Sequence, residues 1–183
     1  MPIPLLPNRR GFSLIEVAIV LTVIGLVVAA IFIATGTVRQ KRATNELMDN
    51  VLFFSQNVRG AYKGLWYTLG LNTPLNRPTS KAGLAPGSWT YISSSDSYKS
   101  AEGAYIAVWS YNTRFSMTIN YDTAFCIMAS KRFSETNLAS TYGILYIRLV
   151  NNSYTNAQFP ISDANILSNC NTSNYFELGF QFD

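Results

Sequence analysis

Residues 9–32 of the chain read RRGFSLIEVAIVLTVIGLVVAAIF, in which two arginines and a glycine precede a long apolar run. One carboxylate, Glu16, lies near the start of this run, and the 22 positions from Val17 to Val38 carry no charge. As an α-helix these positions span about 33 Å, enough to cross a hydrocarbon layer of about 30 Å. Because only a helix satisfies every backbone polar group of a single span, the run predicts a transmembrane helix.

A cleavable secretory signal is the alternative interpretation, since basic residues also precede the apolar segment of such signals. The run is longer than the usual ~7–15 apolar residues of a signal peptide. Ala29 and Ala30, which could form a cleavage site, are followed by further apolar residues. A membrane anchor is therefore the favoured interpretation, although the charges on its two flanks do not decide its orientation.

The basic residues gather beside the apolar run. The chain has 14 Lys and Arg against 10 Asp and Glu, which gives a net charge of +4 and a sequence pI of about 9.1. From residue 64 onward, however, seven basic residues face seven acidic ones. The C-terminal part is formally neutral, so the charge pattern favours a membrane-proximal helix and makes a nucleic-acid partner unlikely by comparison.

The sequence offers little that would serve catalysis or hold a cofactor. It contains no histidine, which removes the commonest general base and the commonest zinc ligand. It has no glycine-rich phosphate loop, and the acids Asp122, Glu135 and Asp163 are scattered along the chain. We therefore expect no enzyme, no cofactor and no metal site.

Cys126 and Cys170 are the only cysteines, and they lie 44 positions apart in the C-terminal part. In a membrane-anchored chain, an even number of cysteines without metal-ligand spacing indicates a disulfide formed in an oxidising compartment. Two buried free thiols of a cytosolic domain are the alternative. The disulfide interpretation places the C-terminal part outside the membrane.

Residues 39–63 continue the helix with a different pattern. Apolar residues recur there at steps of three and four, which predicts an amphipathic helix with one buried face. This face consists of Ala43, Leu47, Val51, Phe54, Val58 and Ala61. Gly60 and Gly64 are the candidate ends of the helix.

Beyond Gly64 the hydrophobic period changes to two, the period of half-buried strands. The stretches FSMTINY (115–121) and YFELGFQF (175–182) alternate in this way, and the stretches GAYIAVWS (103–110), AFCIMAS (124–130) and GILYIRLV (143–150) predict further strands. Residues 70–100, rich in proline and serine, predict a loop or short-helix connection. The expected fold is α+β: a long N-terminal α-helix, transmembrane in its first half and amphipathic in its second, packed on an antiparallel β-sheet of four to six strands.

Glu16 needs an explanation, because a carboxylate in the apolar layer costs about 2.5–3.5 kcal/mol at the helix centre and less near an end. It is tolerated if it lies near the headgroups. However, three prolines in residues 1–8 prevent the helix from extending backward. Cutting the chain after Gly11 would create an α-amino group at Phe12, one turn from Glu16 and also available to a neighbouring subunit. Pairing with that ammonium would offset the cost of burying the carboxylate.

The stretch RRGFSLIEVAIVLTVIGL resembles the prepilin motif of type IV pilins and their relatives. It has a basic leader ending in glycine, then an aromatic residue, and a glutamate in the fifth place of an apolar helix. The resemblance implies that a prepilin peptidase cleaves between Gly11 and Phe12 and N-methylates Phe12. It also implies that Glu16 recruits the N-terminus of the next subunit during assembly.

The same resemblance predicts how the whole chain is divided into segments. It implies a leader peptide at residues 1–11, a transmembrane and filament-core helix at 12–38, an amphipathic stem helix at 39–63 and a globular pilin head at 64–183. Many pilins with a short leader have a helix-bending proline at the place held here by Ile33. Without it, the nearest helix weakener is Gly36, which is where a kink would be expected.

The head also resembles the type IVb pilins of plasmid-borne thin pili. The similarity lies in QNVRGAYKGLWYTLGLNTPL, in GLAPGSWT, and in a terminal cysteine followed by a short closing strand. It implies that Cys126, in a strand, is joined to Cys170, just before the last strand. The short leader and the first residue Phe12 are more typical of type IVa pilins.

The function implied by these resemblances is that of a major structural subunit of a type IV pilus. The precursor would lie in the inner membrane with its head outside, and an assembly ATPase and an inner-membrane platform protein would build it into an extracellular helical homopolymer. The alternative is a minor pilin or a type II secretion pseudopilin that primes, caps or presents a binding surface. A third possibility, an adhesin or DNA-uptake pilin, rests on the aromatic residues, which could stack on sugars or bases.

Overall fold

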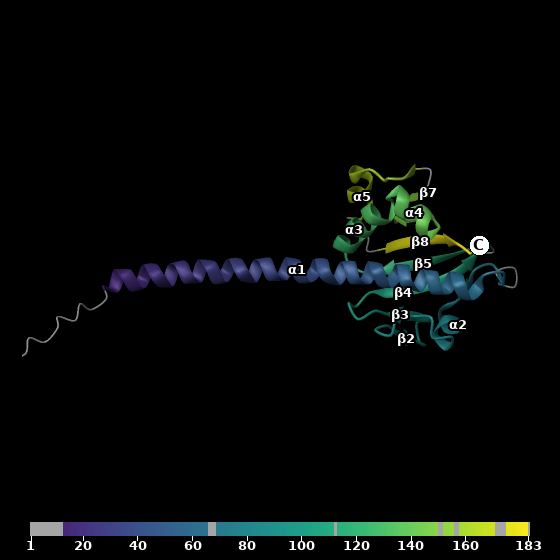
Figure 1. Ribbon diagram of the computed structural model, residues 1–183, viewed down its shortest axis with the longest axis horizontal. Helices are drawn as coiled ribbons and strands as arrows, with labels where there is room; N and C mark the ends of the chain where they lie inside the picture. Colours follow the sequence, from purple (N-terminus) through teal and green to yellow (C-terminus); the bar gives the residue numbers. More distant parts are fainter. Residues whose placement is uncertain are drawn as a thin grey trace, which may run out of the picture. The chain divides into compact units, whose positions relative to one another are not determined.

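The computed structural model of the chain describes residues 13–65, 69–111, 113–149, 152–155, 158–170 and 175–182. The chain divides into two compact units, Met1–Arg42 and Ala43–Asp183. Helix α1, which runs over Leu14–Tyr62, contributes residues to both units (Figure 1).

In the first unit, residues 14–42 of α1 are helical, and every side chain is exposed. The helix includes an 18-residue window with a mean hydropathy of 3.1, so by its length and composition it can cross a membrane. The helical backbone continues through Ile33 and Gly36. The described helix therefore has no break at the position where the sequence would place a kink.

The second unit begins with the amphipathic part of α1. The four central residues of the predicted stripe are fully buried, whereas Ala43 is half-buried and Ala61 is exposed. These four are Leu47, Val51, Phe54 and Val58. Helix α1 ends at Tyr62, and Gly64 then takes a left-handed φ of 73°, a conformation that favours glycine after a helix.

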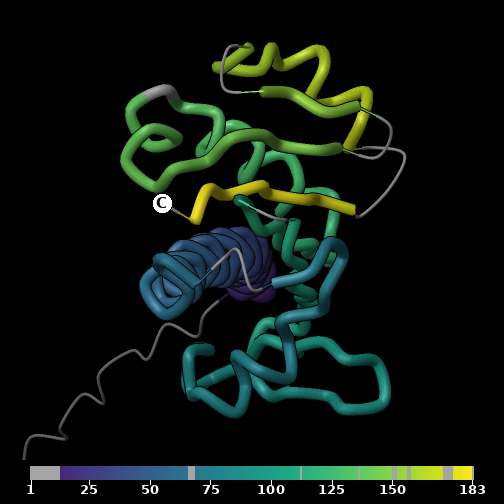
Figure 2. Tube along the Cα trace, turned by 90° about the vertical axis from the view of Figure 1, so that its right-hand side faces the viewer, coloured from purple at the N-terminus to yellow at the C-terminus, as the bar shows by residue number. Residues whose placement is uncertain are grey.

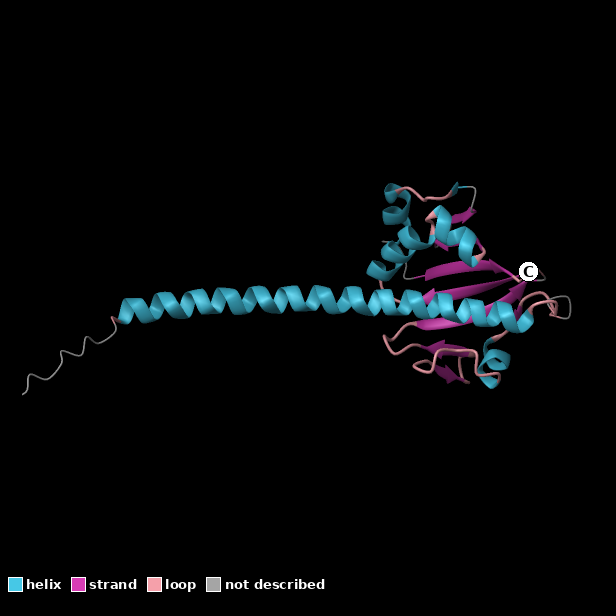
Figure 3. Ribbon diagram, viewed as in Figure 1, coloured by secondary structure: helices cyan, strands magenta, loops and turns pink. Residues whose placement is uncertain are grey.

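Among the described residues, the sheet has eight strands, all paired antiparallel, in the order β2-β3-β4-β5-β8-β6-β7, with the short β1 beside β4. Figure 3 shows the strands of the sheet in magenta. The strands are β1 (Thr73–Pro74), β2 (Thr90–Ile92), β3 (Ser97–Lys99), β4 (Tyr105–Tyr111), β5 (Arg114–Asn120), β6 (Ile144–Leu149), β7 (Asn152–Thr155) and β8 (Tyr175–Gln181). The remaining helices are α2 (Asn76–Lys81), α3 (Thr123–Phe133), α4 (Thr136–Tyr142) and α5 (Asp163–Cys170). The last strand, β8, therefore lies inside the sheet between β5 and β6.

Side chains alternate between two faces of this sheet. The inner face is apolar and buried, and it includes Phe115, Met117 and Ile119 of β5 with Phe176, Leu178 and Phe180 of β8. Helices pack on this face. Phe54 of α1 meets Tyr98 of β3 with ring centroids 5.3 Å apart, and Phe125 of α3 meets Phe176 at 5.8 Å. In Figure 2, α3, α4 and α5 gather with β6 and β7 in the upper part of the view. The outer face carries the residues that alternate with the inner ones, among them Arg114, Tyr146 and Glu177.

The expected α+β fold is confirmed, but one predicted strand is wrong. The stretch AFCIMAS (124–130) belongs to α3, where Asp122 caps the helix by accepting a hydrogen bond from the N–H of Phe125 at 2.6 Å. The buried residues of α3 recur at helical steps and continue to Phe133. A short apolar run fits a helix as well as a strand, and the capping aspartate was the deciding signal.

Other details of the sheet also differ from expectation. The described sheet has eight strands instead of four to six, because residues 70–100 contain β1, β2 and β3 in addition to the short helix α2, and because β7 follows β6 without having been predicted. The sequence also did not predict α4 and α5. Strand β6, within GILYIRLV, is buried on its inner face, and Arg148 on the outer face is exposed.

Candidate functional site

The first turn of α1 holds the site that the sequence singles out. Gly11 and Phe12, the proposed cleavage and methylation positions, lie outside the described residues. Glu16 is exposed in the single chain, and its Oε2 accepts a hydrogen bond from the backbone N–H of Ser13 at 2.9 Å. In return, the Ser13 hydroxyl accepts a hydrogen bond from the N–H of Ile15 at 3.3 Å. Ser13 and Glu16 thus form a reciprocal cap on the helix N-terminus.

This cap gives Glu16 a local role that the sequence reasoning missed. The signal was present, because a serine three residues before a glutamate at the start of an apolar run is the pattern of a capping box. The cap uses Oε2 of the carboxylate, and no described residue is bound to Oε1. The same carboxylate can therefore close its own helix and still accept hydrogen bonds from a neighbouring ammonium group.

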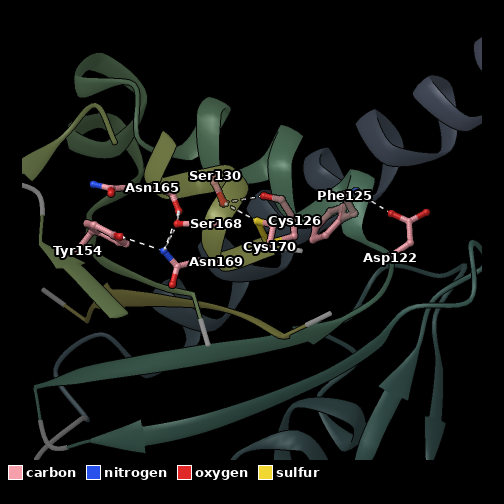
Figure 4. The surroundings of a disulfide bond; sticks show 9 residues. All are labelled: Asp122, Phe125, Cys126, Ser130, Tyr154, Asn165, Ser168, Asn169 and Cys170. Atoms are coloured by element: carbon pink, nitrogen blue, oxygen red, sulfur yellow. Dashed lines mark hydrogen bonds between the residues drawn. A yellow bond between two sulfur atoms is a disulfide. The ribbon is translucent and has the colours of Figure 1, made fainter. Parts of the chain in front are cut away.

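Cys126 and Cys170 are joined by a disulfide, and both are buried. The structure places Cys126 in α3 and not in a strand, and Cys170 at the end of α5, so the bond ties two helices together (Figure 4). A salt bridge of 2.9 Å between Lys131 and Asp163 joins the same two helices at the surface. The disulfide therefore fixes α5, which lies just before β8, to the helix that covers the inner face of the sheet.

The other acids that the sequence offered as a catalytic pair are not brought together. Asp122 caps α3, Asp163 pairs with Lys131, and Glu135 occupies the N-cap position of α4 without a side-chain hydrogen bond to the cap. Among the described residues, no group of three or more His, Cys, Asp or Glu side chains could hold a metal ion. Each of these carboxylates has a local position of its own, and none shares a site with another.

A second cluster, on the outer face of the sheet, surrounds the carboxylate of Glu177. Its side chain is only 3% exposed, and it accepts hydrogen bonds from the hydroxyls of Tyr146 at 2.8 Å and Tyr175 at 2.6 Å. Arg148 completes the set with an N–O distance of 3.2 Å. The Tyr146 ring lies against the backbone at Gly179, where an added Cβ would fall 2.0 Å from the ring. Only glycine therefore leaves room for the ring.

This cluster shifts the acid–base behaviour of its tyrosines. Burial raises the pKa of both Tyr146 and Tyr175 above the ordinary value of 10.0, and the nearby negative charge of Glu177 raises it further. The raised pKa means that the folded chain retains these protons at a pH where the unfolded chain loses them. The stability contributed by the protonated hydroxyls is therefore complete below about pH 10 and is lost as the pH rises beyond it.

We expect the free energy of unfolding to fall as the pH rises from about 10 to about 12, and the fall to be shallower in Tyr146→Phe. The variant keeps the ring but removes one of the two hydroxyls that must ionise against Glu177. Urea unfolding of the full chain in detergent micelles measures the slope. Tyr105→Phe, an exposed tyrosine of β4, is the matched control. If the unfolding free energy fell equally steeply with pH in wild type and in Tyr146→Phe, the raised pKa of Tyr146 would not be the cause of the fall.

Comparison with known proteins identifies a family model that matches the N-terminal part of the chain. Residues 6–32 match the family described as the prokaryotic N-terminal methylation motif, which is the leader signature of type IV prepilins. No curated protein matches the chain. No solved structure matches it either. The matched segment includes Gly11, Phe12, Ser13 and Glu16, so the motif covers the N-terminal site described above.

Proposed function

We propose that this chain, whose leader motif indicates the type IV pilin or pseudopilin family, is the major structural subunit of a type IV pilus. The observation that carries the proposal is the methylation motif at residues 6–32, which extends into a long helix whose apolar side chains are exposed. The motif points to a structural subunit and not to an enzyme. It also implies processing by a prepilin peptidase and pilus assembly.

The proposed route starts in the inner membrane, for which the leader and the apolar helix are suited. The peptidase cuts between Gly11 and Phe12 and methylates the new Phe12 amine. A methylated amine stays basic, so it can still pair with a carboxylate. The head lies outside the membrane, where the disulfide between Cys126 and Cys170 can form.

In the filament, the Phe12 amine of one subunit is proposed to meet the Glu16 carboxylate of its neighbour. This contact joins two different surfaces, so it does not close on itself and generates an open helix. The exposed apolar side chains of residues 14–38 move from lipid into an equally apolar filament core. Because the two environments are alike, the transfer itself is nearly neutral in free energy.

The test is the intact mass of the dominant protein in a sheared surface fraction from the native cell. We expect a chain that starts at methylated Phe12 and is two hydrogens lighter because of the disulfide. If the processed chain were found only in the membrane fraction, or as a trace beside another pilin, the major-subunit role would be wrong. The chain would then be a minor pilin or a pseudopilin, which share the same leader motif.

A further inference from the structure

The outer face of the sheet carries a hollow of about 270 Å³ that the assembly role does not use. Its described lining comes from four strands that the sheet order brings together: β5, β8, β6 and β7, with Tyr111 at the end of β4. The floor is the Tyr146 ring lying against Gly179, and Glu177 lies beside it. Ser153 and Thr155 of β7 add hydroxyl groups at one side.

The charged side chains of this hollow differ in how many hydrogen-bond and ion-pair partners they have. The buried Glu177 carboxylate is bound by three donors, from Tyr146, Tyr175 and Arg148. Arg148 is held further by a hydrogen bond from its Nε to the Ser153 hydroxyl at 3.0 Å. Glu177 therefore positions the Tyr146 ring and Arg148. Its carboxylate can accept few further hydrogen bonds from a ligand.

Arg114 is the second cation of the hollow. Its guanidinium lies over the Tyr146 ring, 5.6 Å from the ring centroid, and Arg148 lies over the same ring at 5.9 Å. Within the part of the chain that the structure describes, Arg114 has no ion pair with a carboxylate. The hollow therefore combines an exposed guanidinium with two tyrosine rings and a rim of hydroxyls.

We propose that this hollow binds an acidic saccharide, a single pyranose ring that carries a carboxylate. The guanidinium fork of Arg114 matches a carboxylate in shape and charge. The C–H face of a pyranose can pack on the ring of Tyr111, and its hydroxyls can hydrogen-bond with Ser153 and Thr155. The volume suits one sugar ring and not a large ligand.

A nucleic acid fits the same surface less well. Binding along a phosphate backbone needs a stripe of cations, because each neutralised phosphate adds to the affinity. The hollow has two arginines, one of which is already paired with Glu177, and residues 64–183 are formally neutral. Among the described residues, Arg114 is the cation of this hollow without a carboxylate partner, and it lies beside tyrosine rings. This arrangement suits a ligand with one negative charge and one ring.

The experiment compares two probes that differ only at one carbon. Methyl glucuronide carries a carboxylate where methyl glucoside carries a hydroxymethyl group, and each is titrated into the purified full chain in a polyoxyethylene detergent, which contains no sugar. Saturation-transfer NMR detects contact and calorimetry gives the affinity. We expect methyl glucuronide to bind at least tenfold more tightly than methyl glucoside. Arg114→Gln should weaken its binding about ten- to hundredfold, the range for a lost charge-assisted hydrogen bond.

The control variant is Arg77→Gln, which removes the same charge from an exposed position on α2. It should leave the affinity for methyl glucuronide unchanged. Equal binding of the two glycosides, an equal loss in both variants, or equally tight binding of inorganic sulfate would each overturn the saccharide proposal. So would tighter binding of a single-stranded oligothymidine. The measurement uses the unassembled chain, so its result is independent of whether the chain is a major pilus subunit.

Discussion

The Glu16→Ala chain is expected to reach the membrane and lose its leader, yet to yield at least tenfold fewer sheared filaments than wild type. The filament yield falls because the variant lacks the carboxylate that is proposed to pair with the Phe12 amine of a neighbouring subunit. A tenfold loss needs only about 1.4 kcal/mol per contact, and a desolvated charge pair contributes more than this when one partner is removed. Filament yield is measured by electron microscopy and by the amount of sheared protein.

The structure supplies the control that separates two roles of this residue. Glu16 also closes the capping box with Ser13, and an N-terminal cap contributes about 1 kcal/mol to a helix. Glu16→Gln keeps the capping geometry, because glutamine serves in a capping box as glutamate does, but it removes the charge. If charge pairing drives assembly, both variants lose filaments. Wild-type filament yield in Glu16→Gln would show that the cap, and not the ion pair, is the essential function.

The processing step gives a second check on the same variants. The peptidase is proposed to act between Gly11 and Phe12, and neither variant changes those residues. The intact mass of the membrane-bound chain should therefore begin at methylated Phe12 in both. An unprocessed precursor in Glu16→Ala would place the defect before assembly and contradict the proposed role of the carboxylate.

The double variant Cys126→Ala/Cys170→Ala is expected to lose about 4 kcal/mol of unfolding free energy, as the chain-entropy model gives for a loop of 44 positions. This is a large part of the 5–15 kcal/mol typical of a folded domain. Both sulfurs are buried between α3 and α5, so alanine also leaves a small cavity. Urea unfolding of the full chain in detergent micelles, followed by tryptophan fluorescence, measures the loss.

A reductant provides the matched control for this prediction. Adding it to wild type should lower the urea midpoint towards that of the double variant, whereas the double variant itself should not respond. Cys126→Ala alone should behave like the double variant, because the bond needs both sulfurs. A double variant with the wild-type midpoint would mean that packing around α3 and α5 holds this region without the covalent bond.

Local patterns predicted the parts of the fold that depend on one segment at a time. The buried stripe of α1 repeats at helical steps. Apolar residues alternate with polar residues or glycine from Phe115 in β5 and from Phe176 in β8, so each pattern fits one type of element. AFCIMAS is short and apolar up to its last residue, and such a run fits either a helix or a strand. Only the cap at Asp122 and the packing of Phe125 on Phe176 decide for a helix.

The two candidate sites differ in the same way, because one is contiguous in the sequence and the other is assembled from distant strands. The motif around Gly11, Phe12 and Glu16 is contiguous and could be recognised in the sequence. The hollow on the outer face could not, because Arg114 and Tyr146 are brought together only when β8 inserts between β5 and β6. A strand order that departs from chain order leaves no trace in the spacing of residues. Gly179 gave a weak hint, since a glycine within a strand marks a close approach.

The exposed apolar helix of the first unit limits how subunits can dissociate from the proposed filament. Fifteen large apolar residues between Leu14 and Val38 are exposed in the single chain. Placing them in water instead of an apolar environment costs on the order of 20–40 kcal/mol. The polymer therefore has, in practice, no soluble monomer and no measurable critical concentration. A filament detached from the cell should keep its length on unlimited dilution, and subunits should leave it only where its end meets a lipid bilayer.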